Sequence, residues 1–204
     1  RIIIAYPLAE VLSFPDRDIF AGILSRDGSI AAAQINTTHP TQRSDLVVFE
    51  PTFGAEPIVL ETDEIYNFFP YDFHPASGDL IYGLRNNMQE TQALYQRSLD
   101  PDASPRLLLG GNAFNANASL SPDGTMIAFT SNASGVGEAF VSRYDSGALV
   151  GQMIPVSNGQ ADGLFWTQAP GEDGLSLRFF TNGVEHVREV ALQNGGVALG
   201  PVGI

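Results

Sequence analysis

The 204-residue chain is predicted to be an all-β protein, a β-propeller built from four-stranded antiparallel blades. Three observations predict this class: the apolar runs are short, no sustained helical periodicity is present, and a strand–turn–strand pattern recurs at a nearly constant interval. The 21 Gly and 13 Pro are spread along the chain and would interrupt helices. Short apolar runs bounded by Gly, Pro, Asn, Asp or Ser are typical of strands joined by hairpins.

The clearest copy of the repeat covers residues 117–131 and reads as strand, turn, strand. In its turn, Pro122 fixes φ at the first central position, Asp123 suits the second, and Gly124 can adopt the left-handed conformation that returns the chain. Weaker copies occupy residues 20–33, 71–82 and 164–180, with turn residues Asp27 and Gly28, Pro75 and Gly78, and Asp173 and Gly174. The turn glycines Gly28, Gly78, Gly124 and Gly174 follow one another at intervals of 50, 46 and 50 residues.

Each copy continues with two further short strands. We expect third strands at residues 45–49, 93–97, 138–143 and 185–190, and fourth strands at 57–60, 106–109, 152–156 and 196–199. Four antiparallel strands in about 45 residues make one propeller blade, and blades must stack to bury both faces. The predicted blades span about residues 15–62, 63–110, 111–158 and 159–204. A solenoid of hairpins is the rival geometry, but it would favour shorter repeats without the four-strand grouping.

Composition excludes several classes of partner and site. The 23 acidic residues outnumber the 10 basic ones, all of them Arg, and give a net charge of −13. Nucleic acid and anionic membrane surfaces are therefore not expected as partners. The absence of Cys excludes a disulfide framework, a thiolate metal site and a cysteine nucleophile. No apolar run reaches the roughly 18 residues of a spanning helix, and no targeting segment precedes Arg1, so we expect a piece of a longer protein or a processed chain.

Residues 120–131, Leu-Ser-Pro-Asp-Gly-Thr-Met-Ile-Ala-Phe-Thr-Ser, followed by Glu138–Val141, resemble the bacterial Ser-Pro-Asp-Gly propeller repeat called PD40. This repeat occurs in TolB-like propellers. The other three copies match in outline only: Arg26 stands where Pro is expected, and His74 stands where the best copy has Ser121. Trp166 precedes the fourth turn, as it often does in family members.

The resemblance implies a ring of six to eight blades, whereas the chain supplies about four. We therefore expect part of a larger ring, with residues 1–14 as strands of a preceding or closing blade. A dimer of half-rings and a complete small ring are the alternatives. The resemblance also implies a periplasmic or otherwise extracytoplasmic location.

The sequence predicts no catalytic, cofactor or metal site. Because Asp27, Asp123 and Asp173 recur at equivalent turns, they are expected to cap the turns rather than to bind a ligand. The three histidines, His39, His74 and His186, do not share a metal-ligand spacing. Residues 100–104 begin like a calcium loop, but Pro105 and Gly111 replace the Gly and Glu that such a loop needs.

Aromatic residues gather in residues 66–73, and most are expected to pack between blades. Any that face the mouth of the axial channel would offer anchors for a partner. The candidate partner-binding residues are Phe68, Phe69, Tyr71, His74 and Trp166.

The favoured function is a non-catalytic scaffold that binds a protein or peptide, since propeller faces present many loops on a rigid frame. The sequence does not specify a small-molecule ligand. The alternative is an accessory propeller of a larger enzyme, either a prolyl-oligopeptidase-like hydrolase or a bacterial Ser/Thr kinase, or a propeller lyase. A lyase would need His, Arg and acidic residues converging on the channel. No hydrolase activity is expected for this chain alone.

Overall fold

The computed structural model describes residues 17–37, 42–52, 54–168 and 174–203. Throughout these ranges every helix or strand assigned is a β-strand, β1 to β16, arranged in four four-stranded sheets. The all-β prediction is therefore confirmed. The strands predicted within residues 1–14 lie outside the described residues. Among the described residues, no helix is long and apolar enough to cross a membrane.

Each sheet is a meander in which every strand pairs antiparallel with its neighbour in sequence. We number the sheets blades 1 to 4 in chain order. Blade 1 contains β1 (Arg17–Leu24), β2 (Ala31–Thr37), β3 (Arg43–Phe49) and β4 (Ile58–Asp63). Blade 2 contains β5 (Tyr66–Phe73), β6 (Leu80–Asn86), β7 (Thr91–Arg97) and β8 (Arg106–Leu109). Blade 3 contains β9 (Asn115–Leu120), β10 (Met126–Ser131), β11 (Glu138–Asp145) and β12 (Ala148–Pro155). Blade 4 contains β13 (Asp162–Gln168), β14 (Leu175–Thr181), β15 (Val184–Gln193) and β16 (Gly196–Gly203).

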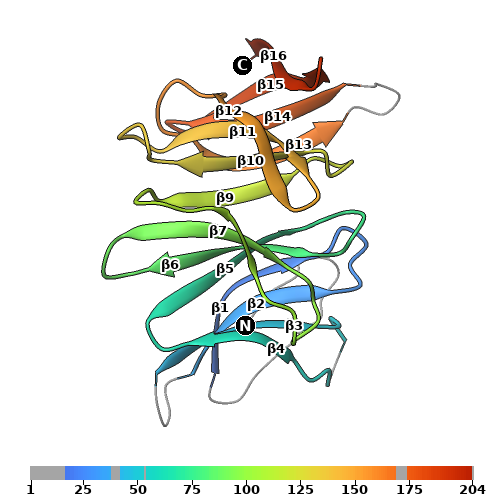
Figure 1. The fold of residues 1–204 in the computed structure, drawn as a ribbon, viewed down its shortest axis with the longest axis vertical. Coiled ribbons are helices and arrows are strands. Elements are labelled where there is room, and N and C mark those ends of the chain that lie inside the picture. Colours follow the sequence, from blue (N-terminus) through green and yellow to red (C-terminus); the bar gives the residue numbers. More distant parts are fainter. Residues whose placement is uncertain (1–16, 38–41, 53, 169–173, 204) are drawn as a thin grey trace.

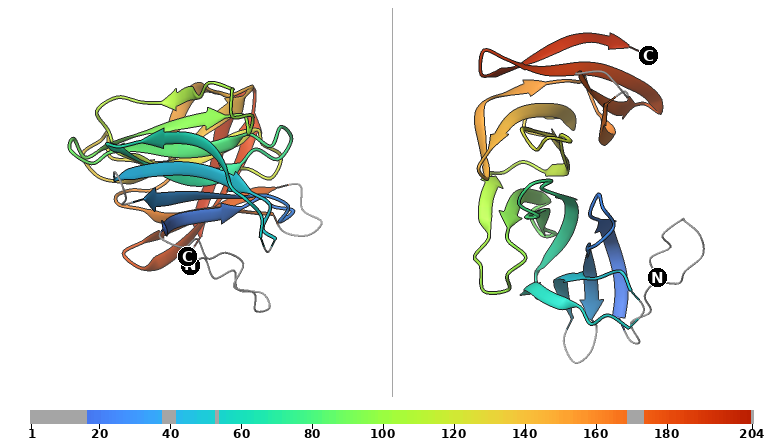
Figure 2. Two further views of the ribbon diagram at one scale, coloured as in Figure 1. Left: turned by 90° about the horizontal axis from the view of Figure 1, so that it is seen from below. Right: turned by 90° about the vertical axis from the view of Figure 1, so that its right-hand side faces the viewer.

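The blades follow one another along the long axis of the molecule, with blade 1 at one end and blade 4 at the other (Figure 1). The first strands of successive blades are in contact, β1 with β5, β5 with β9, and β9 with β13. They are therefore the inner strands, and the second, third and fourth strands lie progressively further out. Figure 2 shows the four sheets as successive layers of an arc. This is the four-blade, partial propeller that the sequence predicts.

Apolar side chains fill the spaces between neighbouring blades. The cluster between blades 1 and 2 includes Leu46, Phe68 and Leu80. The cluster between blades 2 and 3 includes Leu94, Ile127 and Phe129. The cluster between blades 3 and 4 includes Val141, Leu177 and Phe179. Burying one such side chain contributes about 1.5–3 kcal/mol. A single blade leaves these faces exposed, so stacking is the main stabilising interaction of the fold.

The first hairpin turns of the first three blades are closed by equivalent main-chain hydrogen bonds, and each contains a glycine with positive φ. Gly28, Gly78 and Gly124 have φ of +72°, +74° and +73°, in the region that glycine adopts most easily. Gly28 and Gly124 donate their N–H to the carbonyl three positions earlier, and Gly78 donates its N–H to the carbonyl four positions earlier, each at 2.9 Å. In blades 1 and 3, Ser25 and Ser121 donate to the carboxylates of Asp27 and Asp123. Asp173 of the fourth turn lies outside the described residues, and Gly174 borders that gap.

Every inner strand carries a β-bulge, which the sequence did not indicate. The extra residue is Phe20 in β1 and Tyr71 in β5, and it lies at residues 117–118 in β9 and 163–164 in β13. Asn117 and Gly163 have φ of +52° and +61°. Because a bulge reverses the face on which the following side chains lie, it changes which residues point between blades.

Candidate binding groove

A groove of about 570 Å³ lies between blades 2 and 3, at the edge where the first hairpin turns are found. Blade 2 contributes His74, Asp79, Gln96 and Arg106 to its lining, and blade 3 contributes Asp123, Thr125, Tyr144 and Asp145. We call it the blade 2–3 groove. Its volume is within the range of natural ligand pockets, roughly 300–1,000 Å³.

A chain of hydrogen bonds fixes the floor of the groove. The Tyr144 hydroxyl donates to Oε1 of Gln96, and Nε2 of Gln96 donates to Oδ2 of Asp79 at 2.6 Å. Arg106 Nη1 donates to the main-chain carbonyl of Ser146 at 2.8 Å, which adds a second link between the two blades. The groove therefore has side chains held in place before any ligand arrives, which lowers the entropic cost of binding.

The phenol of Tyr144 stays protonated at neutral pH. Burial, with the negative charge of Asp79 as a second cause, raises the pKa of Tyr144 to about 12, although Arg106 opposes the shift. The hydroxyl is thus a hydrogen-bond donor to Gln96, and the amide of Gln96 is held with its NH₂ toward Asp79.

His74 is held by its own turn. Its Nδ1 accepts main-chain N–H groups from Ala76 and Ser77 at 3.3 and 3.1 Å, which places the proton of the neutral ring on Nε2. That Nε2 has no hydrogen-bond partner among the described residues and lies close to Gly124. A Cβ at Gly124 would lie 2.7 Å from it, so this glycine is needed for close approach as well as for its φ.

The groove is acidic on its accessible surface. Asp79, Asp123 and Asp145 contribute carboxylates, and Oδ1 of Asp79 accepts no hydrogen bond from the described residues. Hydrogen bonds from Ser121 and Thr125 outweigh the opposing effect of burial and lower the pKa of Asp123.

Arg97 also borders the groove, but its guanidinium donates to Glu61 and to carbonyls including those of Leu60 and Asp100. Arg97 therefore offers little charge to a ligand.

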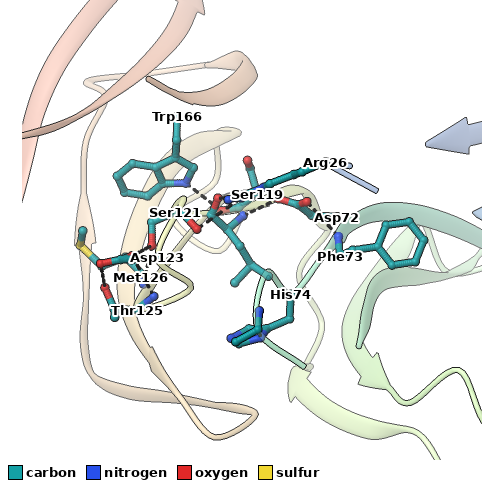
Figure 3. A network of polar contacts seen from close by, with 12 residues as sticks. Arg26, Asp72, Phe73, His74, Ser119, Ser121, Asp123, Thr125, Met126 and Trp166 are labelled. Carbon is teal, nitrogen blue, oxygen red and sulfur yellow. Dashed lines mark hydrogen bonds and ion pairs between the residues drawn. The ribbon is translucent and has the colours of Figure 1, made fainter. Parts of the chain in front are cut away.

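A second polar network ties the ends of the inner strands together (Figure 3). Arg26 Nη2 donates to the carbonyl of Leu120 at 2.7 Å and lies 3.6 Å from Oδ2 of Asp72. The N–H of Leu120 donates to the same Asp72 oxygen at 2.8 Å. Burial raises the pKa of Asp72, while the Leu120 N–H and the charge of Arg26 partly offset this. Trp166 Nε1 donates to the carbonyl of Ser119 at 2.9 Å, so the network joins all four blades.

The Arg26 and Asp72 side chains are thus engaged with main-chain groups. An arginine and a carboxylate therefore meet at the inner strands, as a lyase site would require. Their hydrogen bonds, however, connect one blade to another. Within the described residues, no three His, Asp or Glu side chains are close enough to hold a metal ion.

The five partner-binding candidates are not brought together. Phe68 is 3% exposed and belongs to the core between blades 1 and 2. Phe69 packs edge-to-face on Phe20, with ring centroids 6.0 Å apart. Tyr71 accepts a hydrogen bond from Gln92 between blades 2 and 3, and Trp166 packs against the cluster between blades 3 and 4. Only His74 lines the blade 2–3 groove.

Of the eight lining residues named above, the sequence singles out only His74, as a candidate for partner binding, and Asp123, as a turn residue. The sequence carries no signal for Gln96, because its strand, Thr-Gln-Ala-Leu-Tyr-Gln-Arg, is polar at both ends, and only the structure shows that Gln96 is 8% exposed.

Comparison with known proteins identifies the fold. No family model matches the chain, and no curated protein matches it. A solved structure assigned to TolB of Agrobacterium tumefaciens superposes with a TM-score of 0.60 and 18% identity, over 87% of this chain and 63% of that one. The chain resembles TolB-like propellers. Apo prolyl oligopeptidase B of Galerina marginata also matches, with a TM-score of 0.60 and 12% identity over 97% of this chain.

The TolB-like resemblance expected from the sequence is confirmed at the level of the fold. The chain spans 63% of the length of the TolB structure and 28% of that of the oligopeptidase. At 18% and 12% identity, the likeness concerns the propeller fold alone. Membership of the PD40 repeat class stays a prediction.

Proposed function

We propose that this TolB-like propeller is a non-catalytic scaffold that binds a protein or peptide segment in the blade 2–3 groove. The observation that carries the proposal is the groove itself, with an ordered polar floor and a carboxylate oxygen of Asp79 that has no partner among the described residues. Loops on a rigid frame are a common basis for recognition.

The charge of the groove defines the partner's chemistry. Asp79, Asp123 and Asp145 contribute carboxylates to the groove, and Asp145 pairs with Arg143. Arg106 donates to the Ser146 carbonyl and is the lining arginine without a carboxylate partner among the described residues. The chain as a whole carries −13 and would repel an acidic partner while attracting a basic one. The proposed ligand is therefore an extended segment that places a Lys or Arg side chain beside Asp79.

The experiment is a selection of random nonapeptides on the purified chain, followed by affinity measurement for the enriched peptides. We expect the enriched sequences to contain Lys or Arg, and the Kd to rise about tenfold in Asp79→Asn, since a charge-assisted hydrogen bond contributes about 1.5–3 kcal/mol. Asn at this position can still accept the hydrogen bond from Gln96, so the groove should keep its shape.

The matched control is Asp18→Asn, which removes one negative charge from exposed β1, outside the groove. It should leave the Kd unchanged within twofold. Enriched peptides without basic residues, or equal affinity for the wild type and Asp79→Asn, would contradict the proposal.

One observation favours the second candidate, an accessory propeller of a larger enzyme. The match to the oligopeptidase covers nearly all of this chain but 28% of that protein. Under this proposal the catalytic residues belong to another domain, and the purified chain hydrolyses no peptide. Hydrolysis of a peptide by the natural full-length protein, but not by this chain, would support it.

A periplasmic or extracytoplasmic location is also part of the proposal, with the TolB-like fold as its support. Fractionation of cells that produce the natural full-length protein tests it, and recovery only with cytosolic markers would contradict it.

A further inference from the structure

A second pocket, of about 450 Å³, is lined by residues of blades 2, 3 and 4 at the opposite edge of the sheets. Its lining comes from the start of β9, from the ends of β6 and β10 with the loops that follow them, and from the start of β13. It includes Arg85, Phe114, Asn117, Thr130 and Asp162. The blade 2–3 groove is lined instead by the turns that follow the first and third strands. In an antiparallel meander these two sets of connections lie at opposite strand ends, so the two sites are separate.

Arg85 is the unusual residue of this pocket. Its guanidinium carbon lies over the ring of Phe114, 5.3 Å from the centroid, and its Nε is buried without a hydrogen-bond partner. No carboxylate of the described residues forms an ion pair with it. Every other arginine with a described side chain donates to a carboxylate or a carbonyl. These arginines are Arg26, Arg43, Arg97, Arg106, Arg143, Arg178 and Arg188. The Nε of Arg178 is buried without a partner as well, so the distinguishing feature of Arg85 is that none of its nitrogens has an acceptor among the described residues. Its guanidinium, on a partly buried side chain, is therefore available to a ligand acceptor.

The repeat does not require an arginine at this position. Arg85 lies six residues after Asp79, whose carbonyl accepts the His74 N–H. In blades 1 and 3 the carbonyls that close the same turn are those of Ile30 and Met126. The residues six positions after them are Asn36 and Asn132. Both asparagines are satisfied locally: Asn36 Oδ1 accepts from Gln34 at 2.9 Å, and Asn132 Oδ1 accepts the Phe114 N–H at 2.7 Å. Arg85 therefore replaces a satisfied amide by an unpaired cation.

The remaining polar groups restrict the ligand. Glu90 and Asp162 add two negative charges to the lining, so the pocket is not a general anion site. Asn117 is held at φ +52° in the β9 bulge, and its Nδ2 donates to the Thr130 hydroxyl at 3.3 Å. A ligand that fits these charges carries one carboxylate for Arg85 and one ammonium group for the acidic residues, whereas dianions such as phosphate would be repelled.

We propose that this pocket binds a small zwitterion, a free amino acid or a short peptide, with its carboxylate on Arg85 and its ammonium group toward Glu90 and Asp162. The cation–π contact with Phe114 helps to hold the Arg85 guanidinium at the pocket, where its N–H groups can donate to a carboxylate. The volume accommodates two or three amino-acid residues. This proposal does not depend on peptide binding in the blade 2–3 groove.

The test is calorimetric titration of the full chain with triglycine, triglycinamide and N-acetyltriglycine. We expect triglycine to bind and the amide, which lacks the carboxylate, to bind at least about tenfold more weakly. N-acetyltriglycine, which lacks the ammonium group, should also bind more weakly.

Arg85→Asn, which introduces the residue found in blades 1 and 3, should weaken triglycine binding by at least about tenfold. Arg178→Asn removes the same charge from a pair with Glu185 in blade 4 and should have no effect.

Absence of triglycine binding to the wild type, or equal affinity in Arg85→Asn, would overturn the proposal. Equal binding of N-acetyltriglycine would overturn the role of Glu90 and Asp162. A direct readout guards against a folding defect in the variant: the ¹⁵Nε resonance of Arg85 in the wild type, assigned with Arg85→Lys, should shift with triglycine and not with triglycinamide. If peptide selection on the groove fails but triglycine binds through Arg85, this proposal stands and the groove proposal falls.

Discussion

The guanidinium of Arg26 in blade 1 donates to the main-chain carbonyl of Leu120 in blade 3 at 2.7 Å. This contact passes over blade 2, whose Asp72 accepts the N–H of the same leucine at 2.8 Å. One backbone unit of β9 is thereby held by two side chains from two other blades. The connection restrains the angle between blades 1 and 3 more directly than packing against blade 2 alone.

Replacing Arg26 by Gln should lower the free energy of unfolding. The amide is shorter and uncharged, so both the hydrogen bond to Leu120 and the attraction to Asp72 are lost. Because the Arg26 side chain is 40% exposed, we expect a loss of only about 1 kcal/mol, measured by urea unfolding. Arg143→Gln, which removes an exposed pair with Asp145, is the control and should change stability by less than about 0.5 kcal/mol. Equal stability of wild type and Arg26→Gln would contradict a structural role for the contact.

The Asp27 carboxylate should titrate at unusually low pH. Hydrogen bonds from Ser25 and then Ser29 lower its pKa to about 2 from the ordinary 3.8. Because the folded-state pKa is the lower one, the ionised group stabilises the fold above about pH 4, and this contribution is lost as the pH falls through about 2. Carboxyl ¹³C NMR should find a midpoint near 2 in the wild type.

The Ser25→Ala variant tests the cause of that shift. The Ser25 hydroxyl donates at 2.7 Å and has the largest effect on the pKa, so its removal should move the midpoint up toward 3.8. An unshifted midpoint in the variant would show that another group sets the pKa.

Replacing Gly83 by Ala should destabilise the interface between blades 2 and 3. A Cβ at this position would lie 2.9 Å from Cε2 of Tyr71 and closer still to the amide of Gln92. That amide cannot move freely, since Nε2 of Gln92 donates to the Asn115 carbonyl at 2.9 Å and Asn115 donates back to the Gln92 carbonyl at 3.1 Å. We expect a loss of about 2 kcal/mol in chemical unfolding.

The open turn glycine Gly135 provides the comparison. Its φ is +99°, but a Cβ there would meet no atom within 4 Å, so Gly135→Ala reports backbone strain without overpacking. If Gly83→Ala were no more destabilising than Gly135→Ala, close packing over Gly83 would not be the cause.

The fold could be predicted from the sequence because its signals are local. The Asp-Gly and Pro-Asp-Gly turns at Gly28 and Gly124 depend on neighbouring residues only, and their regular recurrence reveals the blades. The departure of Arg26 from the repeat was visible as an exception, but its partner Leu120 lies 94 positions away. No local pattern indicates a contact of that kind.

The groove could not be predicted, because it depends on how strands from two blades are aligned. Asp79, Gln96 and Tyr144 come from three separate segments and meet through strand pairing and blade stacking. The bulges in the inner strands change which side chains point between blades, so alternation alone assigns some of the aromatic residues of 66–73 to the wrong face. Only His74 among the aromatic candidates was placed at the groove.

The central claim is that the blade 2–3 groove binds the partner, and mapping the binding site by NMR tests it most directly. Amide chemical shifts of the labelled chain would be followed while a selected Arg-containing peptide is added. We expect the largest changes on groove residues such as Gly124, Tyr144 and Gly147, and we expect them to diminish in Asp79→Asn. Changes concentrated instead at the inner-strand aromatic residues Phe20 and Phe69, with the groove unaffected, would contradict it.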